Sequence, residues 1–313
     1  MSPTSPSATT AALLRANRRG ILYMCAAMGC FVINDSLVKY ASQSMNSAQL
    51  IFLRGVMASV LVLALVQAIG AMRGIGEILR GWVAVRAWVD AGGTFIYLIA
   101  LFHLPIVNAT AIIMTAPLFI ALLAAWLMHE RVGIGRWLAI GLGFLGVVLV
   151  IQPRAEGFNI YALVCLFGTL LMAVRDLMTR RVASAVPSII ITLSTAVAVT
   201  ILSGAASLVE GWSAFGGFEL GLLALASIFL AGGYFFIVIG MRHGELSVVG
   251  PFRYSGMLWA LVIGYLVWGD IPNSLAWMGI ALLTGSGLYV VYSERRRGRI
   301  ADRAPIDAPS RPA

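Results

Sequence analysis

The sequence is poor in charge. Only 11% of its 313 residues are Asp, Glu, Lys or Arg, whereas an ordinary soluble domain carries roughly a quarter. Hydrophobic residues make up 60% of the chain, and the mean hydropathy is +0.92. A buried core does not account for this excess, because a soluble protein of this size still needs a polar surface. The shortage of charge therefore argues against a soluble domain and indicates a protein whose solvent is lipid.

Cysteine is scarce as well. The three cysteines, Cys25, Cys30 and Cys165, all lie inside apolar runs. They form no C-x-x-C pair and have no histidine at metal-ligand spacing, so the pattern argues against a cysteine metal site. We interpret them as small buried apolar residues.

Motifs that carry chemistry are missing from the chain. There is no Walker-type glycine-rich loop, so ATP does not drive the protein directly. There is no G-x-S-x-G elbow with a partner histidine. We therefore expect neither a cofactor nor an enzyme. An intramembrane enzyme using the carboxylates of Asp90 and Asp176 is the alternative that spacing leaves open.

Basic residues outnumber acidic ones by 22 to 13, which gives a net charge of +9. Most of them stand between apolar runs or in the two tails. Arg295, Arg296, Arg297 and Arg299 directly follow the last apolar run, where positive charge anchors a helix on the cytoplasmic side. The basic balance thus indicates a lipid bilayer as partner, and we expect no nucleic acid.

Ten apolar runs are long enough to cross a bilayer, which takes about 20 residues each. They span roughly 20–42, 48–70, 84–103, 105–128, 134–152, 158–181, 187–209, 217–241, 246–268 and 274–293. The sequence therefore predicts an all-α polytopic membrane protein. We expect residues 1–19 to be a disordered cytoplasmic tail, since no cleavage site follows Ala27. Residues 294–313 are expected to be a disordered basic tail.

The distribution of arginine predicts the orientation. With a cytoplasmic N-terminus, the outer side holds little positive charge beyond Arg154, with Lys39 at the end of the first run. The inner side then collects Arg15, Arg18, Arg19, Arg73, Arg80, Arg86, Arg131, Arg136, Arg180, Arg181, Arg242 and the C-terminal arginines. We expect a multi-pass protein of a bacterial inner membrane with both termini in the cytoplasm.

The chain repeats itself at one offset. A shift of 140 residues places Gly92, Gly93, Phe95, Ile99, His103 and Trp137 on Gly232, Gly233, Phe235, Ile239, His243 and Trp277. A shift of 141 places Asp35 on Asp176. We expect two five-helix repeats, 20–152 and 158–293, joined by a linker at 153–157. An odd number of helices inverts the second repeat, which is an architecture of alternating access.

Several segments resemble a known family. They are Asn34-Asp35-Ser36-Leu37-Val38-Lys39, Pro117 to Trp126 with Glu130, and Gly135-Arg136-Trp137 through Gly146, echoed at Asp270, Trp277, Gly279 and Gly285. On these residues the chain resembles the drug/metabolite transporter superfamily, in particular its EamA-type members. The resemblance implies a ten-helix secondary transporter. It leaves the substrate open, because such proteins move amino acids, vitamins, nucleotide-linked metabolites and toxic cations.

Ionisable residues inside apolar runs usually face a cavity or one another. Asp35 and Arg54 each lie roughly 8–9 Å inside the outer end of a helix, so they can pair across an outer mouth. Asp90 and Arg253 have comparable depths from the inner side. These charges are either alternating gates, or contacts to a zwitterionic substrate, or static pairs between helices.

The middle of the membrane is where a substrate is expected to bind, at broken helices. Thr115 lies near mid-depth, and aromatic rings there can stack on a ligand or hold a cation. The predicted substrate-binding or gating residues are Asp35, Arg54, Asp90, Tyr97, Thr115, Tyr234, Arg253, Tyr254 and Trp259.

Small residues form stripes in the fifth and tenth runs. They are Gly141, Gly143 and Gly146 in one, and Gly279, Gly285, Ser286 and Gly287 in the other. Because such stripes mark close helix contact, we expect these helices to be scaffold or to form a homodimer.

The function predicted from these features is secondary transport of a small organic metabolite. An amino acid or related compound, exported, is the first expectation, because one Arg and one Asp in an aromatic cavity suit a zwitterion. Uptake of an aromatic vitamin or nucleoside-like metabolite is the alternative, since the same rings suit it.

Overall fold

The computed structural model describes residues 8–127, 133–152, 159–179, 181–183, 186–243 and 246–301, and this part of the chain contains helices and no strand. The elements are α1 (Ala8–Ala41), α2 (Ser47–Ala68), η1 (Ala71–Glu77), α3 (Gly81–His103), α4 (Ile106–Ile113), α5 (Ala116–Leu127), α6 (Ile134–Ile151), α7 (Tyr161–Thr179), α8 (Ser188–Glu210), α9 (Gly217–His243), α10 (Leu246–Val249), η2 (Gly250–Tyr254), α11 (Ser255–Trp268) and α12 (Ser274–Ala301). The all-α fold class is confirmed.

Nine stretches of the described residues are long and apolar enough to cross a membrane. The ninth expected run, 246–268, is divided into α10, the 3₁₀ turn η2 and α11. Pro251 lies at the start of that turn and has no N–H to continue the helix above it. The fourth run is also interrupted, at Met114 and Thr115. The ring of Pro117 would clash there with the carbonyl of Ile113, where α4 ends.

The parts of the two expected tails that adjoin the membrane helices are helical in the structure. α1 begins at Ala8 and α12 continues to Ala301, so residues 8–19 and 294–301 extend the first and last membrane helices. The expected linker at 153–157 lies outside the described residues, as do residues 1–7 and 302–313.

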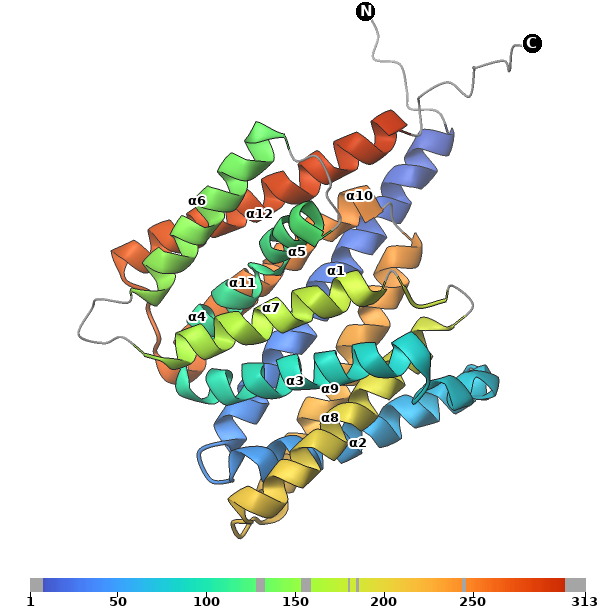
Figure 1. Cartoon of the computed structure of the whole chain (residues 1–313), viewed down its shortest axis with the longest axis vertical. Coiled ribbons are helices and arrows are strands. Elements are labelled where there is room, and N and C mark those ends of the chain that lie inside the picture. The colour runs from blue at the N-terminus through green and yellow to red at the C-terminus, as the bar shows by residue number, and fades with distance from the viewer. Residues whose placement is uncertain are drawn as a thin grey trace, which may run out of the picture.

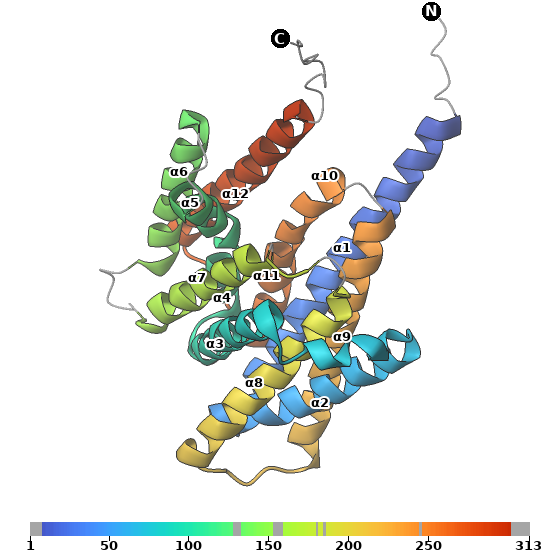
Figure 2. The same ribbon diagram turned by 45° about the vertical axis from the view of Figure 1, so that its right-hand side comes forward.

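The helices pair as two inverted repeats require. α1 packs chiefly on α9, and their repeat counterparts α7 and α3 pack on each other. α2 pairs with α8 and α6 pairs with α12, each helix with its own counterpart. Figures 1 and 2 show that α1 starts and α12 finishes at the same end of the bundle, which we call the terminal end. The opposite end is the far end.

The glycine stripes of α6 and α12 face each other within one chain. A Cβ built on Gly146 would lie 2.7 Å from the carbonyl oxygen of Gly279, and one on Gly279 would lie 2.6 Å from that of Gly146. Gly93 of α3 and Gly168 of α7 approach in the same way, at 3.2 and 3.1 Å. A methyl group at Gly146 or Gly279 would need the backbone to shift, and one at Gly93 or Gly168 would be tight, so both pairs of helices pack closely. This supports the expectation that α6 and α12 are scaffold.

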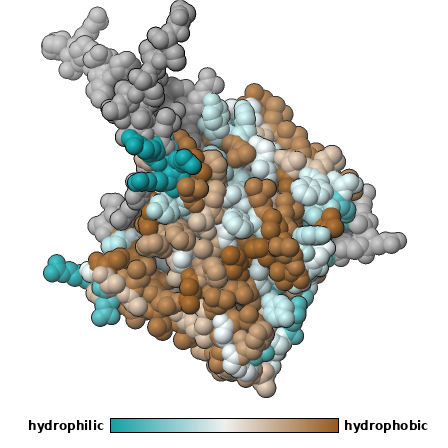
Figure 3. All heavy atoms as spheres, turned by 180° about the vertical axis from the view of Figure 1, so that it is seen from behind, coloured by the Kyte–Doolittle hydropathy of each residue, from teal (hydrophilic) through white to brown (hydrophobic). Residues whose placement is uncertain are grey.

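The surface of the bundle is apolar. Exposed large side chains include Leu138, Leu142 and Leu145 on α6 and Leu266 and Val267 on α11. Figure 3 shows hydrophobic residues spread over most of one face, with hydrophilic ones gathered towards its edges. A soluble protein does not expose a contiguous apolar surface of this extent, so the chain is a multi-pass membrane protein.

We predict that Gly146→Ala lowers the thermal stability of the detergent-solubilised protein. The added methyl overlaps the Gly279 carbonyl, and overpacking of this kind costs about 1–3 kcal/mol. Gly141→Ala on the same helix is the matched control, because nothing lies within 4 Å of its Cβ. Its melting temperature should be unchanged or higher, since alanine favours helix. Equal melting temperatures for both variants would contradict the close contact.

Candidate functional site

A buried polar cluster joins α1, α2 and α3 in the half of the bundle nearer the far end. The hydroxyl of Tyr97 donates to Asp35 Oδ2 at 2.8 Å, and Asn34 Nδ2 donates to Asp35 Oδ1 at 2.8 Å. Arg54 Nη1 donates weakly to Asn34 Oδ1 at 3.4 Å. Asn34, Arg54 and Tyr97 are buried, while Asp35 is partly exposed. We call these four residues the far-side cluster.

The direct ion pair that the sequence makes possible between Asp35 and Arg54 is absent. Both oxygens of Asp35 have other donors, and Asn34 stands between the carboxylate and the guanidinium. Sequence reasoning missed the role of Asn34. Its signal was a polar side chain next to Asp35 in an apolar run, and the structure buries it to 1% exposure.

A second cluster lies nearer the terminal end and centres on Asp90. Arg175 Nη1 of α7 contacts Asp90 Oδ1 at 2.6 Å, and Arg86 Nη1 contacts Asp90 Oδ2 at 3.5 Å. Thr195 of α8 donates its hydroxyl to the same oxygen at 3.0 Å. Arg175 also pairs with Asp176 at 2.9 Å. We call these five residues the terminal-side cluster. The structure thus brings Asp90 into a fully paired network, and Arg86 and Thr195 are members that sequence reasoning missed.

The two clusters occupy equivalent positions of the repeat. The shift of 141 residues that places Asp35 on Asp176 also places Asn34 on Arg175 and Arg54 on Thr195. Helix α3 contributes to both clusters, with Tyr97 in the far-side cluster and Arg86 and Asp90 in the terminal-side cluster. Tyr97 and Asp90 are seven residues apart, so they share a face of α3 about 10 Å apart along its axis. One helix therefore links both sites.

Tyr234 of α9 is within electrostatic range of both clusters, because Asp90 and Arg175 of one and Arg54 of the other act on its hydroxyl. The residue is nevertheless 39% exposed. It is therefore a candidate ligand contact near both clusters. The ring of Phe31 meets it edge-on, with centroids 5.3 Å apart.

The remaining predicted site residues lie apart from this centre. Thr115 is fully buried and donates to Ile112 O at 2.6 Å, at the break between α4 and α5. Trp259 is partly exposed and donates to Cys25 O of α1 at 3.1 Å. Tyr254 is buried, with its hydroxyl unpartnered and close to Gly287. Arg253 is exposed on the turn η2. The structure does not bring these four residues to the clusters.

Contacts of α1 with α3 and of α11 with α4 close the far end of the bundle. Lys39 Nζ of α1 donates to the carbonyl of Leu101 at 2.9 Å and also to that of Leu104, at the end of α3. Gly264 of α11 lies against Ile106 and Val107 of α4. Together with the Tyr97–Asp35 bond, these contacts close α1 onto α3 and α11 onto α4.

Part of the terminal end lies outside the described residues. The repeat relates the α1–α3 contact to α7–α9, and it relates the start of α4 on α11 to α10 on α5. The counterpart of Lys39 is residue 180, which is one of those that the structure does not describe. Among the described residues, neither α7–α9 nor α5–α10 is one of the more extensive helix contacts.

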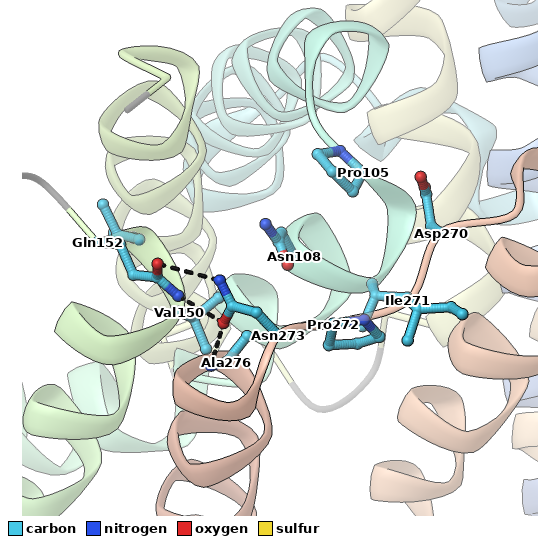
Figure 4. Close-up of a pocket in the computed structure, with 11 residues that line it drawn as sticks. Pro105, Asn108, Val150, Gln152, Asp270, Ile271, Pro272, Asn273 and Ala276 are labelled. Atoms are coloured by element: carbon cyan, nitrogen blue, oxygen red, sulfur yellow. Dashed lines mark hydrogen bonds between the residues drawn. The ribbon is translucent and has the colours of Figure 1, made fainter. Parts of the chain in front are cut away.

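A pocket of about 350 Å³ opens at the far end, between the ends of α4 and α6 and the segment before α12. Figure 4 shows Asn108, Asp270 and Asn273 around it. Gln152 and Asn273 exchange hydrogen bonds at 2.8 and 3.2 Å, which ties α6 to α12. Asn108, at the start of α4, lines this pocket.

Comparison with known proteins gives one consistent family. The EamA-like transporter family matches residues 18–152. The chain is 30% identical to the riboflavin transporter of Rhizobium johnstonii over 72% of each protein. It is 23% identical to the S-adenosylmethionine uptake transporter of Rickettsia prowazekii, over 90% of this chain and 96% of that protein. It is 24% identical to the pseudopaline exporter of Pseudomonas aeruginosa, over 85% and 93%.

A solved crystal structure has the same fold. It aligns with a TM-score of 0.60 at 20% identity and covers 92% of this chain and 98% of that chain.

We predict that Arg175→Gln destabilises the protein by about 3 kcal/mol, because it removes the closest partner of a carboxylate that is 5% exposed. Asp176→Asn is the control: its carboxylate is 34% exposed, so its loss should cost less than about 1 kcal/mol. Chemical unfolding in detergent measures both. Adding Asp90→Asn to Arg175→Gln should restore part of the loss. If the double variant is no more stable than Arg175→Gln, the pair does not have this role.

Proposed function

Since the chain belongs to the EamA-like transporter family, whose relatives here are named as transporters rather than enzymes, we propose that it takes up an aromatic vitamin or nucleoside-like metabolite by alternating access. The observation that carries the mechanism is the closed far end, where Lys39 and the Tyr97–Asp35 bond join α1 to α3 and where α11 packs on α4. A carrier with two equivalent halves alternates between a state closed at one end and a state closed at the other.

The names of the relatives support this substrate class. The riboflavin and S-adenosylmethionine transporters both carry ligands with a nitrogen-rich aromatic ring system. The partly exposed ring of Tyr234 near the two polar clusters suits such a ligand. Export of an amino acid or related compound, the first expectation from the sequence, is the second candidate. The relative named as an exporter favours that direction.

The orientation follows from the arginines. Arg15, Arg18 and Arg19 lie in the part of α1 at the terminal end. Basic residues also follow the last apolar run. Positive charge at this end supports cytoplasmic termini in a bacterial inner membrane. On that orientation the joined far end faces outward, so the bundle is closed towards the outside. Asp35 and Tyr97, with Lys39, then form the outer gate.

A homodimer through α6 and α12 is kept as part of the proposal. Their glycine stripes are used within one chain, so a partner would have to contact their outer faces. These faces carry exposed Trp137, Leu142, Trp277 and Met278.

The substrate is tested by uptake into proteoliposomes containing the purified protein. The panel comprises labelled riboflavin, S-adenosylmethionine, nucleosides and amino acids, with and without an imposed pH gradient. We expect saturable uptake of riboflavin or of a nucleoside-like compound, and none in liposomes without protein. Saturable movement of amino acids alone would replace the proposal by its second candidate. Dependence on the gradient would add proton coupling.

The gate is tested by a disulfide across the far end. In a variant whose native cysteines are replaced, Val107→Cys and Gly264→Cys place two thiols at the α4–α11 contact, where a Cβ on residue 264 lies 3.1 Å from the Val107 side chain. Oxidation should lower the rate of transport by at least about tenfold, because this end must open during the cycle, and reductant should restore the rate. The single Val107→Cys variant is the control. Full transport by the cross-linked protein would rule out opening at this end.

A further inference from the structure

Arg54 has fewer hydrogen bonds than a buried guanidinium requires. It is 6% exposed and carries five N–H donors. One side-chain bond is recorded for it, the 3.4 Å contact to Asn34 Oδ1, and its Nε is buried without a partner. Asp35, Tyr234 and Tyr97 are the groups that act electrostatically on this guanidinium.

The charge of Arg54 is also incompletely balanced. Asp35 is the carboxylate that acts on it, but Tyr97 and Asn34 occupy the oxygens of Asp35 and no ion pair forms. The other arginines of the site, the partly buried Arg86 and Arg175, each contact Asp90 directly. Burying an unpaired cation is costly, and inside a membrane such residues are retained mainly for function.

The fold itself does not need an arginine at this position. The repeat places Thr195 at the position in α8 that corresponds to Arg54 in α2. These two helices pack against each other as counterparts, and a much smaller side chain fills the second position. Thr195 donates to Asp90 and completes its cluster. Arg54 does not complete its own cluster in this way. The two halves therefore differ in that the Nε of Arg54 has no acceptor.

We propose that Arg54 is the residue that selects the substrate, by donating to one carbonyl oxygen of a planar, uracil-like ring edge such as the imide edge of a flavin. A guanidinium is a strong, charge-assisted donor to such an oxygen. Asp35, partly exposed and linked to Arg54 through Asn34, accepts the imide N–H next to that carbonyl. Tyr234 supplies the accessible aromatic surface beside them. This inference rests on the proposed uptake of an aromatic vitamin or nucleoside-like compound.

The test compares Arg54→Gln and Arg54→Lys with Arg73→Gln, an exposed arginine outside the cluster. We expect the KM for riboflavin to rise about 10- to 100-fold in both Arg54 variants, the range for losing hydrogen bonds to a charged group. The KM of Arg73→Gln should match the wild type. Riboflavin methylated at the imide nitrogen should be a poor substrate of the wild type.

Thermal stability separates binding from a structural role. An arginine that held the helices together would destabilise the protein when replaced, whereas removal of an unpaired buried charge should leave the melting temperature of Arg54→Gln unchanged or higher. Failure of Arg54→Gln to yield monodisperse protein would overturn the inference. A wild-type KM for riboflavin in Arg54→Lys would also overturn it.

Failure of this inference differs from failure of the proposed function. If the wild type transports riboflavin and both Arg54 variants keep its KM, the selecting role is overturned and the proposed function stands. If the wild type transports only amino acids, with a KM that depends on Arg54, the flavin edge is overturned while Arg54 stays a binding residue. If nothing in the panel is transported, both are overturned.

Discussion

Lipid solvates neither ions nor unpaired backbone groups, and this constraint governs where polar residues stand in the bundle. Asp90 meets it by contacts with Arg86, Arg175 and Thr195 at once. Lys39 meets it by donating to carbonyls at the end of α3. Asp90 thereby joins α3 to α7 and α8, and Lys39 joins α1 to α3. The residues that the membrane tolerates least are thus also the ones that hold the helices together.

The two repeats pack their helices in equivalent ways, but they carry different side chains at matching positions. α1–α9 and α3–α7 pack alike, yet α3 contributes Tyr97 to one cluster and Asp90 to the other. Its counterpart α9 has Leu230 and Ile237 at the matching positions, 140 residues later. A site between two such unequal halves is able to bind an asymmetric ligand in one orientation, which two chemically identical halves would not specify.

The fold was predictable because its signals are local. A run of about 20 apolar residues crosses a bilayer whatever its neighbours are, and Pro117 and Pro251 interrupt helices by their own covalent structure. The site was predictable only as a set of residue types. Asp35, Arg54, Asp90, Tyr97 and Tyr234 do come together around one region, but Thr115, Arg253, Tyr254 and Trp259 do not, because depth along a helix says nothing about which way a side chain faces its neighbours.

By itself the sequence determined the solvent, the apolar helices, the repeat and the family, since each depends on composition, run length or self-similarity along the chain. Only the tertiary structure decided that Asn34 separates Asp35 from Arg54, that Asp90 binds Arg175, and that Lys39 joins α1 to α3 at the far end. The reason is that these facts concern rotation and distance between helices. Close packing of residues far apart in the chain sets both, as the contacts of Gly93 with Gly168 and of Gly146 with Gly279 show.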